Sequence, residues 1–493
     1  MTGRDHALDI AARHRRPRSH AVTDEARTDA PGATADLLVR DALTVVTMDE
    51  QRREIAGGWV AVRDGFVVGV GEPGTEPPAT RTMSAAGCLV TPGLVNTHHH
   101  LYQNLTRAYA PALGGKLFRW LVELYPRWRH IDEEAVHIST WIGLAELALG
   151  GCTTTTDHLY VHPHGAGDLM AAEIGAAADL GLRFHPTRGS MSLSEKDGGL
   201  PPDDCVEDDD TILAESERVV RTFHDPSPGA MCRIALAPCS PFSVTPELMA
   251  QTAELAERLD VRLHTHLAED PGEDDFCLSQ FGRRPVEHLE ALGWITDRTW
   301  VAHCVHPNPA EIVRLGAAGV GAAHCPSSNM ILGAGMAPVR ELVAAGAPVG
   351  IGCDGSASAD AASLWGEARN AMLVARLRAA QAGEEELPGA RDTLELATLG
   401  GAACLGRTGE LGTLAPGAVG DLVAWKLDGV AFAGALSDPV EAWLRCGPVA
   451  AHHTVVAGRP IVESGMLRRD DLDEKLRHHE VVARRIQGLG ERP

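Results

Sequence analysis

The chain has few positive charges for its length, and this shortage excludes one large class of function. Lysine and arginine number 44 among 493 residues, against 67 acidic residues, so the formal net charge is −23 at pH 7. Binding to nucleic-acid phosphates needs a basic surface. We therefore expect no nucleic-acid partner and favour a protein that acts on small molecules.

Long apolar runs, clustered cysteines and a leader segment are missing as well. No uninterrupted apolar stretch reaches the roughly 18 residues that indicate a membrane span, the eleven cysteines are scattered, and no signal peptide opens the chain. These absences predict a reduced, cytoplasmic protein with no membrane partner. Residues 1–34 mix charges with Pro, Ala and Thr without apolar periodicity, which predicts a disordered tail.

Short Val-rich segments occur near both ends of the chain. Residues 35–87 and 406–470 contain such segments, separated by Gly and Asp-Gly turns that are typical of antiparallel strands. The two regions predict one small β-sandwich domain formed from both chain ends. Residues 471–493 are expected to form a C-terminal helical tail.

Between these regions, residues 88–405 alternate short apolar segments with Ala, Leu and Glu-rich segments of helical period. Eight segments are strand candidates: CLVTPGLVNTHHH, CTTTTDH, RFHPTRG, RIALAPCS, RLHTHLAE, TWVAHC, GVGAAHCPSSN and PVGIGCDGS. Eight βα units in about 300 residues predict an α/β fold of the (β/α)8 TIM-barrel type. A doubly wound sheet is the alternative, but no G-x-G-x-x-G follows the early strands.

Three consecutive histidines end the first strand candidate. The alternation of a strand places His98 and His100 on one face and His99 on the other. Alone, such a triplet could equally be a solvated surface feature. Three other strand candidates, however, carry His266, His303 and Asp354 near their ends. Imidazole nitrogen with carboxylate oxygen suits zinc or iron, so the combination favours a metal site.

These motifs resemble the amidohydrolase superfamily, and within it the cytosine, guanine and S-adenosylhomocysteine deaminases. That pattern has H-x-H on the first strand, H-x-x-E on the fifth, His on the sixth and Asp on the eighth. The resemblance implies a homo-oligomer with one divalent metal, zinc expected and iron the alternative, bound by His98, His100, His266 and Asp354. It also implies catalytic roles for Glu269 in proton transfer, His303 in binding the attacking water, and Asp354 in taking the proton of that water.

A lysine that binuclear members of the superfamily use bears on how many metal ions the site holds. Those proteins resemble one another in bridging two ions with a carboxylated lysine at the end of the fourth strand. This chain has only four lysines, none at a predicted strand end, and its fourth strand offers Cys239 instead. A mononuclear site is therefore expected. The cytidine-deaminase type of zinc site is disfavoured, because its P-C-x-x-C segment is absent.

The substrate is suggested by longer segments, including NTHHHLYQNLTRA, RGSMSLSEKDGGLPPDD and HCPSSNMILGAGMAPVRE. They resemble the 8-oxoguanine deaminase group, which lies near the hydroxyatrazine aminohydrolases. The resemblance implies hydrolytic deamination of an amino-substituted N-heterocycle, and 8-oxoguanine is the expected substrate. An oxygen-rich planar ring needs hydrogen-bonding groups and an aromatic face, which we expect from Gln103, Arg188, and Trp128 or Tyr125.

Alternatives remain at this stage. The same site could serve a triazine-type alkylaminohydrolase or chlorohydrolase. A non-enzymatic dihydropyrimidinase-like scaffold is disfavoured because the metal set is complete. The aromatic residues could instead belong to ordinary helix packing, and Arg188 could belong to a structural ion pair. Whether His324 and Trp365 contact the substrate stays open.

Overall fold

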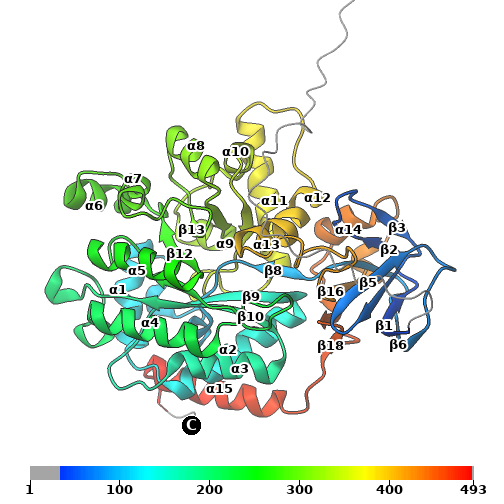
Figure 1. Ribbon diagram of the computed structural model, residues 1–493, viewed down its shortest axis with the longest axis horizontal. Coiled ribbons are helices and arrows are strands. Elements are labelled where there is room, and N and C mark those ends of the chain that lie inside the picture. The colour runs from blue at the N-terminus through cyan, green and yellow to red at the C-terminus, as the bar shows by residue number, and fades with distance from the viewer. Residues whose placement is uncertain (1–33, 491–493) are drawn as a thin grey trace, which may run out of the picture.

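The computed structural model describes residues 34–490, and its centre is a closed barrel of eight parallel strands (Figure 1). The strands are β8 (Leu94–Asn96), β9 (Cys152–Leu159), β10 (Arg183–Ser190), β11 (Ala235–Pro238), β12 (Arg262–Leu267), β13 (Thr299–His303), β14 (Gly321–His324) and β15 (Val349–Ile351). Each lies within, or overlaps, one of the eight predicted segments. The predicted TIM barrel is therefore confirmed.

The first predicted strand is in fact two strands. β7 (Cys88–Pro92) belongs to a different sheet, and only β8 joins the barrel. The break falls at Gly93, where a Cβ would lie 1.9 Å from the Thr153 hydroxyl oxygen. Only glycine lets the chain pass this closely over β9, so a single residue separates the two sheets.

Helices surround the barrel and alternate with its strands. They are α1 (Leu117–Trp128), α2 (Glu133–Leu149), α3 (Leu169–Leu180), α4 (Asp209–Phe223), α5 (Pro246–Leu259), α6 (Pro271–Phe281), α7 (Pro285–Ala291), α8 (Pro309–Ala318), α9 (Pro326–Ile331), α10 (Val339–Ala345), α11 (Leu364–Gln381), α12 (Ala390–Glu395) and α13 (Gly401–Cys404). A short 3-10 helix, η1 (Leu101–Thr106), directly follows the histidine triplet.

The ends of these helices follow from local sequence signals, as α8 illustrates. Asn308 caps the helix by accepting hydrogen bonds from the backbone nitrogens of Ala310 and Glu311, both at 3.0 Å. Pro309 occupies the first helical position, where no donor is needed. Gly319, with φ of 69°, ends the helix in the left-handed conformation that glycine favours. The chain can then enter β14 after a short turn.

Two further sheets form a small β-sandwich beside the barrel. One has the order β5-β4-β1-β6 and the other β19-β18-β17-β16-β7-β2-β3. The strands are β1 (Ala35–Arg40), β2 (Thr44–Val46), β3 (Glu54–Ala56), β4 (Trp59–Arg63), β5 (Phe66–Gly71), β6 (Ala79–Ser84), β16 (Leu422–Lys426), β17 (Ala451–Val456), β18 (Arg459–Glu463) and β19 (Met466–Leu467). Val39 and Val62 of one sheet share a buried core with Val90 and Leu422 of the other. The predicted β unit built from both chain ends is confirmed.

A buried ion pair joins the sandwich to the barrel. Arg183, at the start of β10, contacts Asp421, just before β16, with 3.1 Å between Nη2 and Oδ1. Neither side chain is more than 4% exposed. Arg183 also donates to the carbonyl of Ala230 at 2.9 Å, and Asp421 accepts from the backbone nitrogen of Ala457 at 2.7 Å. The pair therefore ties together four segments of the chain.

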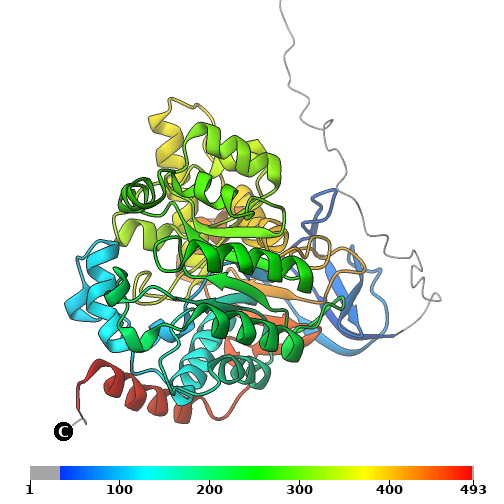
Figure 2. The ribbon, with the colours of Figure 1, turned by 60° about the vertical axis from the view of Figure 1, so that its left-hand side comes forward.

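The last helices lie outside this core. α14 (Pro439–Arg445) packs beside the seven-stranded sheet, and α15 (Leu472–Gln487) runs along the outside of the barrel against α2 (Figures 1 and 2). Among residues 34–490, no helix combines the length and the apolar character needed to cross a membrane. The disordered tail predicted for residues 1–34 lies, apart from its last residue, outside the described residues.

Replacing Asp421 by Asn tests the buried ion pair. The substitution leaves the Arg183 guanidinium buried without its counter-charge, and breaking such a pair costs about 3 to 5 kcal/mol. We expect a correspondingly lower free energy of unfolding in urea, followed by fluorescence. Asp428→Asn is the matched control, because Asp428 is 62% exposed and its pair with Lys426 is open to solvent. Equal stability of the two variants would contradict the role assigned to Asp421.

Candidate active site

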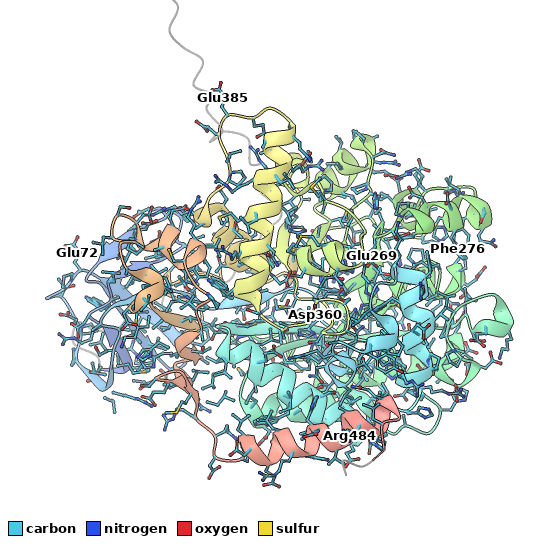
Figure 3. All side chains as sticks on the ribbon, turned by 180° about the vertical axis from the view of Figure 1, so that it is seen from behind. Glu72, Glu269, Phe276, Asp360, Glu385 and Arg484 are labelled. Carbon is cyan, nitrogen blue, oxygen red and sulfur yellow. The ribbon has the colours of Figure 1, made fainter. Side chains whose placement is uncertain are left out.

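The polar side chains predicted from the sequence as metal ligands and catalytic groups lie together at the carboxyl ends of the barrel strands. They are His98 and His100 after β8, His266 on β12, Glu269 after it, His303 at the end of β13, and Asp354 after β15. None is more than 9% exposed. Figure 3 draws the side chains on the ribbon and labels Glu269. The closed barrel thus brings residues that are far apart in sequence to one buried point.

Three imidazoles and one carboxylate face one another. The Nε2 atoms of His98 and His100 each lie 3.3 Å from Oδ1 of Asp354. Nε2 of His100 also lies 3.1 Å from Nε2 of His266. Four potential ligand atoms therefore surround one small volume.

Backbone carbonyls orient two of these rings. Nδ1 of His100 donates to the carbonyl oxygen of His158 at 2.7 Å, and Nδ1 of His266 donates to that of Cys239 at 2.6 Å. Because a carbonyl only accepts hydrogen bonds, Nδ1 carries the proton in both rings. Each Nε2 therefore directs a lone pair toward the centre of the site.

The third ring is oriented through another histidine. Nδ1 of His264 donates to the carbonyl oxygen of Trp300 at 2.9 Å, so Nε2 of His264 is an acceptor. It accepts from Nδ1 of His98 at 2.8 Å, which leaves the lone pair of His98 on Nε2. His264, two residues before His266 on the same strand, thus lies behind His98 as a supporting residue.

The donor set fits a divalent cation. Two lone pairs facing each other at 3.1 Å, on His100 and His266, repel unless a positive charge lies nearby. Protonation is a poor solution, because burial lowers the pKa of both rings and of His98. Nε2 of His98 has no hydrogen-bond partner among residues 34–490. Imidazole nitrogens with one carboxylate oxygen are a usual zinc ligand set.

Two groups beside this set can move protons. Nε2 of His303 lies 3.7 Å from Oε2 of Glu269 and 4.0 Å from Oδ2 of Asp354. Burial raises the pKa of Glu269 to about 7, so this carboxyl can both donate and accept near neutral pH. Burial alone would lower the pKa of His303, but Glu269 and Asp354 outweigh it and the net pKa is raised.

The backbone is strained where these groups leave the strands. Ala268, His303 and Asp354 have φ values of 51°, 67° and 57°, in the left-handed region that residues other than glycine seldom adopt. Each such residue costs about 1 to 3 kcal/mol. The packed barrel maintains these turns, and the turns direct the side chains into the site.

A narrow pocket opens beside the candidate ligands. Its lining includes His100, His266, Glu269, His303 and Asp354 together with Gln103, Leu117, Trp120, Leu121, Tyr125, Tyr160, Cys239, Phe242, Leu332 and Ser358. Gln103 lies against the backbone after Asp354, since a Cβ on Gly355 would come within 1.8 Å of its Oε1. That Oε1 is buried and has no hydrogen-bond partner in the described part of the chain.

Trp128, expected to contact the substrate, lies elsewhere. Its indole is fully buried, is absent from the pocket lining, and donates from Nε1 to the hydroxyl of Thr106 at 3.1 Å. Tyr102, Trp120 and Tyr125 pack edge-on against it. Trp128 therefore supports η1 from behind, and ordinary helix packing explains its position.

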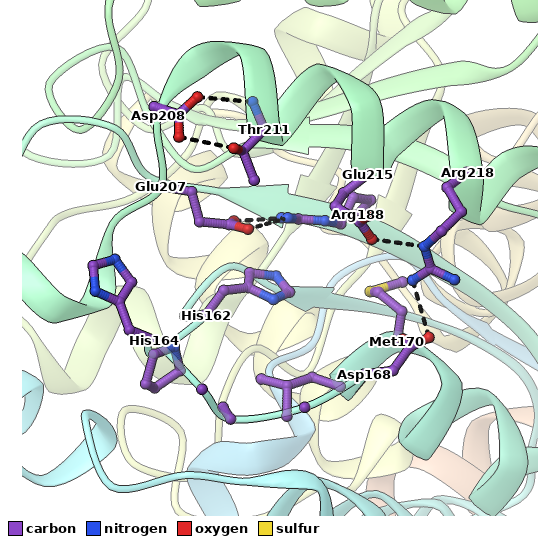
Figure 4. Close-up of a pocket in the computed structure, with 15 residues that line it drawn as sticks. His162, His164, Asp168, Met170, Arg188, Glu207, Asp208, Thr211, Glu215 and Arg218 are labelled. Carbon is purple, nitrogen blue, oxygen red and sulfur yellow. Dashed lines mark hydrogen bonds and ion pairs between the residues drawn. The ribbon is translucent and has the colours of Figure 1, made fainter.

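Arg188 is also placed differently from the expectation. Its Nη2 donates to both carboxylate oxygens of Glu207, at 2.7 and 2.9 Å (Figure 4). The pair lines a separate cavity with His162 and Arg218, and this cavity shares no lining residue with the pocket beside the candidate metal ligands. The guanidinium therefore forms an ion pair with Glu207 and lies outside the lining of the pocket that contains Gln103.

Two residues whose roles the sequence leaves open, Trp365 and His324, lie outside the pocket lining, and one further residue, His158, lies near the candidate ligands. Trp365 donates to the carbonyl oxygen of Trp443 at 3.0 Å in an apolar core, and His324 lines another cavity near α10 and α11. Neither lines the pocket. His158 was missed, although it ends a predicted strand: its ring nitrogen lies within 4.8 Å of the ligand nitrogens of His98, His100 and His266.

Comparisons with known proteins agree with this geometry. The model of the amidohydrolase family matches residues 89–461. The chain is 48% identical over 448 residues to 8-oxoguanine deaminase of Pseudomonas aeruginosa, covering 90% of this chain and 98% of that protein. It is 37% identical to hydroxydechloroatrazine ethylaminohydrolase of a Pseudomonas species, covering 90% and 94% of the two chains.

Solved structures show the same architecture. Atrazine chlorohydrolase of Arthrobacter aurescens, crystallised with zinc, superimposes with a TM-score of 0.86 and 35% identity. The superposition covers 91% of this chain and all of that one. The barrel with its accompanying sheets is therefore shared across nearly the whole described chain.

Replacing His264 by Phe tests the support behind His98. The change removes the acceptor that holds the proton on Nδ1 of His98. Loss of such a supporting hydrogen bond lowers metal affinity by about 10- to 100-fold. Zinc affinity measured by competition with a chelator should fall by that factor. His452→Phe, in β17 of the seven-stranded sheet, is the control and should bind zinc as the unmodified protein does. Indistinguishable zinc affinities for the two variants would rule out the supporting role of His264.

Proposed function

The chain belongs to the amidohydrolase family, and we propose that it is a metal-dependent hydrolytic deaminase that converts 8-oxoguanine to urate and ammonia. The observation that carries the proposal is the buried set of three inward imidazole nitrogens and Asp354, beside a carboxyl whose pKa is about 7. The 48% identity to an 8-oxoguanine deaminase supports the substrate.

One divalent ion, zinc, would be held by His98, His100, His266 and Asp354, whose ring nitrogens and carboxylate approach one another. Such an ion lowers the pKa of a water toward about 7 and so supplies a nucleophile at neutral pH. None of the four lysines lines the pocket, which supports one ion rather than a bridged pair. Iron accepts the same ligands and is the alternative.

The protein's own groups would move the protons. Asp354 takes one proton from the attacking water, whose oxygen adds to the ring carbon that carries the amino group. Glu269 protonates the adjacent ring nitrogen, and His303 hydrogen-bonds the incoming oxygen. Glu269 then takes the remaining proton of the added hydroxyl, and Asp354 passes its proton to the amino group. The C–N bond breaks and ammonia leaves while a carbonyl forms, so both carboxyls return to their starting states. Glu269 suits this sequence because its pKa of about 7 allows transfer in both directions.

The pocket would hold a planar, oxygen-rich ring. The free Oε1 of Gln103 can accept a hydrogen bond from a ring N–H. Trp120, Tyr125 and Phe242 offer aromatic surface for the ring faces. These residues replace Trp128 and Arg188 in the proposed recognition.

Hydrolysis of an alkylamino-triazine is the second candidate. It is supported by the 37% identity to a hydroxydechloroatrazine ethylaminohydrolase and by structural neighbours that are triazine hydrolases. The same metal and proton-transfer groups would act, and only the ring and the leaving amine would differ.

The two candidates separate in one assay. We expect about one metal ion per chain by mass spectrometry, and faster ammonia release from 8-oxoguanine than from guanine, isocytosine or ammeline. Hydroxyatrazine, which releases an alkylamine, should be a poor substrate. Turnover of hydroxyatrazine alone would select the second candidate, and two bound metals would refute the mononuclear site.

Glu269→Gln should keep the metal and lose most activity. The amide cannot donate and accept the proton as the carboxyl does, and removal of a general acid–base group costs about 10²- to 10⁴-fold in kcat. Steady-state kinetics with metal analysis measure both quantities. Asp275→Asn, on the exposed side of nearby α6, is the control. Full activity of Glu269→Gln would remove this residue from the mechanism.

We also propose that the protein acts in the cytoplasm as a homo-oligomer. All eleven cysteines are unpaired, which suits a reducing compartment. The assembly is suggested by family resemblance, and light scattering of the purified protein would measure it.

A further inference from the structure

The C-terminal helix α15 packs directly on η1, the short helix that begins one residue after His100. Figures 1 and 2 both show α15 along the side of the barrel that carries α2. Val482 and Ile486 of α15 are at most 2% exposed and belong to the same apolar core as Tyr102 and Leu105 of η1. Two segments nearly 400 residues apart in the chain therefore share one interface.

Two hydrogen bonds from α15 reach η1. Nε2 of His479 donates to Oδ1 of Asn104 at 2.8 Å, and Nε2 of Gln487 donates to the carbonyl oxygen of Leu105 at 2.7 Å. Asn104 is bound on its other side as well, since its Nδ2 donates to the carbonyl oxygen of Ser139 on α2 at 2.8 Å. That bond orients the amide so that its oxygen faces His479.

The anchoring of η1 differs from that of the metal ligand before it. His100 is held by β9, through the carbonyl oxygen of His158. The start of η1 is also held by β9, since the backbone nitrogen of Leu101 donates to Oδ1 of Asp157 at 2.6 Å. Its later residues are held by outer helices: Asn104 by α2 and α15, Leu105 by α15, and Thr106 by Trp128 of α1. The hydroxyl of Thr106 in turn donates to the carbonyl oxygen of Gln103 at 3.1 Å. The backbone nitrogen of Gln103 donates to the carbonyl oxygen of His100 at 3.0 Å, so Gln103 is held on one side by His100, which follows β8, and on the other, through Thr106, by the outer helices.

Gln103 is the residue of η1 that lines the pocket, and its buried Oε1, which lies against Gly355, has no hydrogen-bond partner among residues 34–490. We propose that α15 is a positioning element for substrate binding: His479 and Gln487 hold η1 so that the Gln103 amide meets the heterocyclic ring. This inference rests on the proposed function. It assigns His479 an indirect role, because His479 lies outside the pocket lining.

The contact persists at neutral pH. Burial lowers the pKa of His479 to about 4, and the positive charges of Arg107 and His478 act in the same direction. The ring is therefore neutral, with its proton on the Nε2 that faces Asn104. Glu134 pairs with the neighbouring His478, with 2.9 Å between Oε1 and Nε2.

His479→Ala and His478→Ala form a matched pair for the test. Both remove an imidazole from adjacent positions of α15, but His478 is 43% exposed and pairs with the exposed Glu134. Loss of the His479 bond should raise KM for 8-oxoguanine about 5- to 10-fold, with kcat and metal content nearly unchanged. Hydrogen–deuterium exchange should rise in the peptide covering residues 101–107. His478→Ala should alter none of these quantities, and His479→Gln, which keeps a donor, should restore KM.

Two results would overturn the proposal: exchange at residues 101–107 that is the same in both alanine variants, or faster exchange in His479→Ala with an unchanged KM. Loss of metal from His479→Ala would also overturn it, because η1 would then support His100 rather than Gln103. If the unmodified protein releases no ammonia from any heterocycle, the proposed function fails. The exchange measurement still decides whether His479 holds η1.

Discussion

The hydrogen bond that each buried imidazole donates away from the centre is the interaction on which the site depends. Nδ1 of His100 and of His266 bonds a carbonyl of a neighbouring barrel strand. Strand pairing therefore determines which nitrogen of each ring faces inward. The inward nitrogen of His98 is determined through one more ring: His98 donates to His264, and Nδ1 of His264 donates to the carbonyl oxygen of Trp300. The closed barrel is thus part of the ligand geometry, since opening it would break the hydrogen bonds that keep the proton on Nδ1 of each ring.

Most of the barrel and of the candidate ligand set could be predicted from sequence because both follow short-range rules. Parallel strands are buried on both faces and read as short apolar runs, and their carboxyl ends lie at one rim. Strand alternation separates His98 and His100 from His99 without knowledge of the fold. Four widely spaced polar residues at strand ends then coincide only if the strands form one closed ring.

Tertiary packing determines the positions of the residues that lie elsewhere than the sequence led us to expect. Tyr125 and Trp128 are three positions apart on α1, so helical periodicity puts them near the same face. Only the position of η1 decides that Tyr125 lines the pocket while Trp128 bonds Thr106. Arg188 finds Glu207 across a loop without any periodic pattern. Gly93, which divides one predicted strand into β7 and β8, acts through a close approach to Thr153 that sequence does not reveal.

The seven-stranded sheet has a consequence for synthesis on the ribosome. β7 lies between β2, which precedes it, and β16, which follows it by roughly 330 residues. At the usual translation rate of about 5 to 20 residues per second, one edge of β7 waits about 16 to 66 seconds for its partner. The nascent chain therefore carries an open strand edge next to the emerging barrel, and the last strands close it only when translation is almost complete.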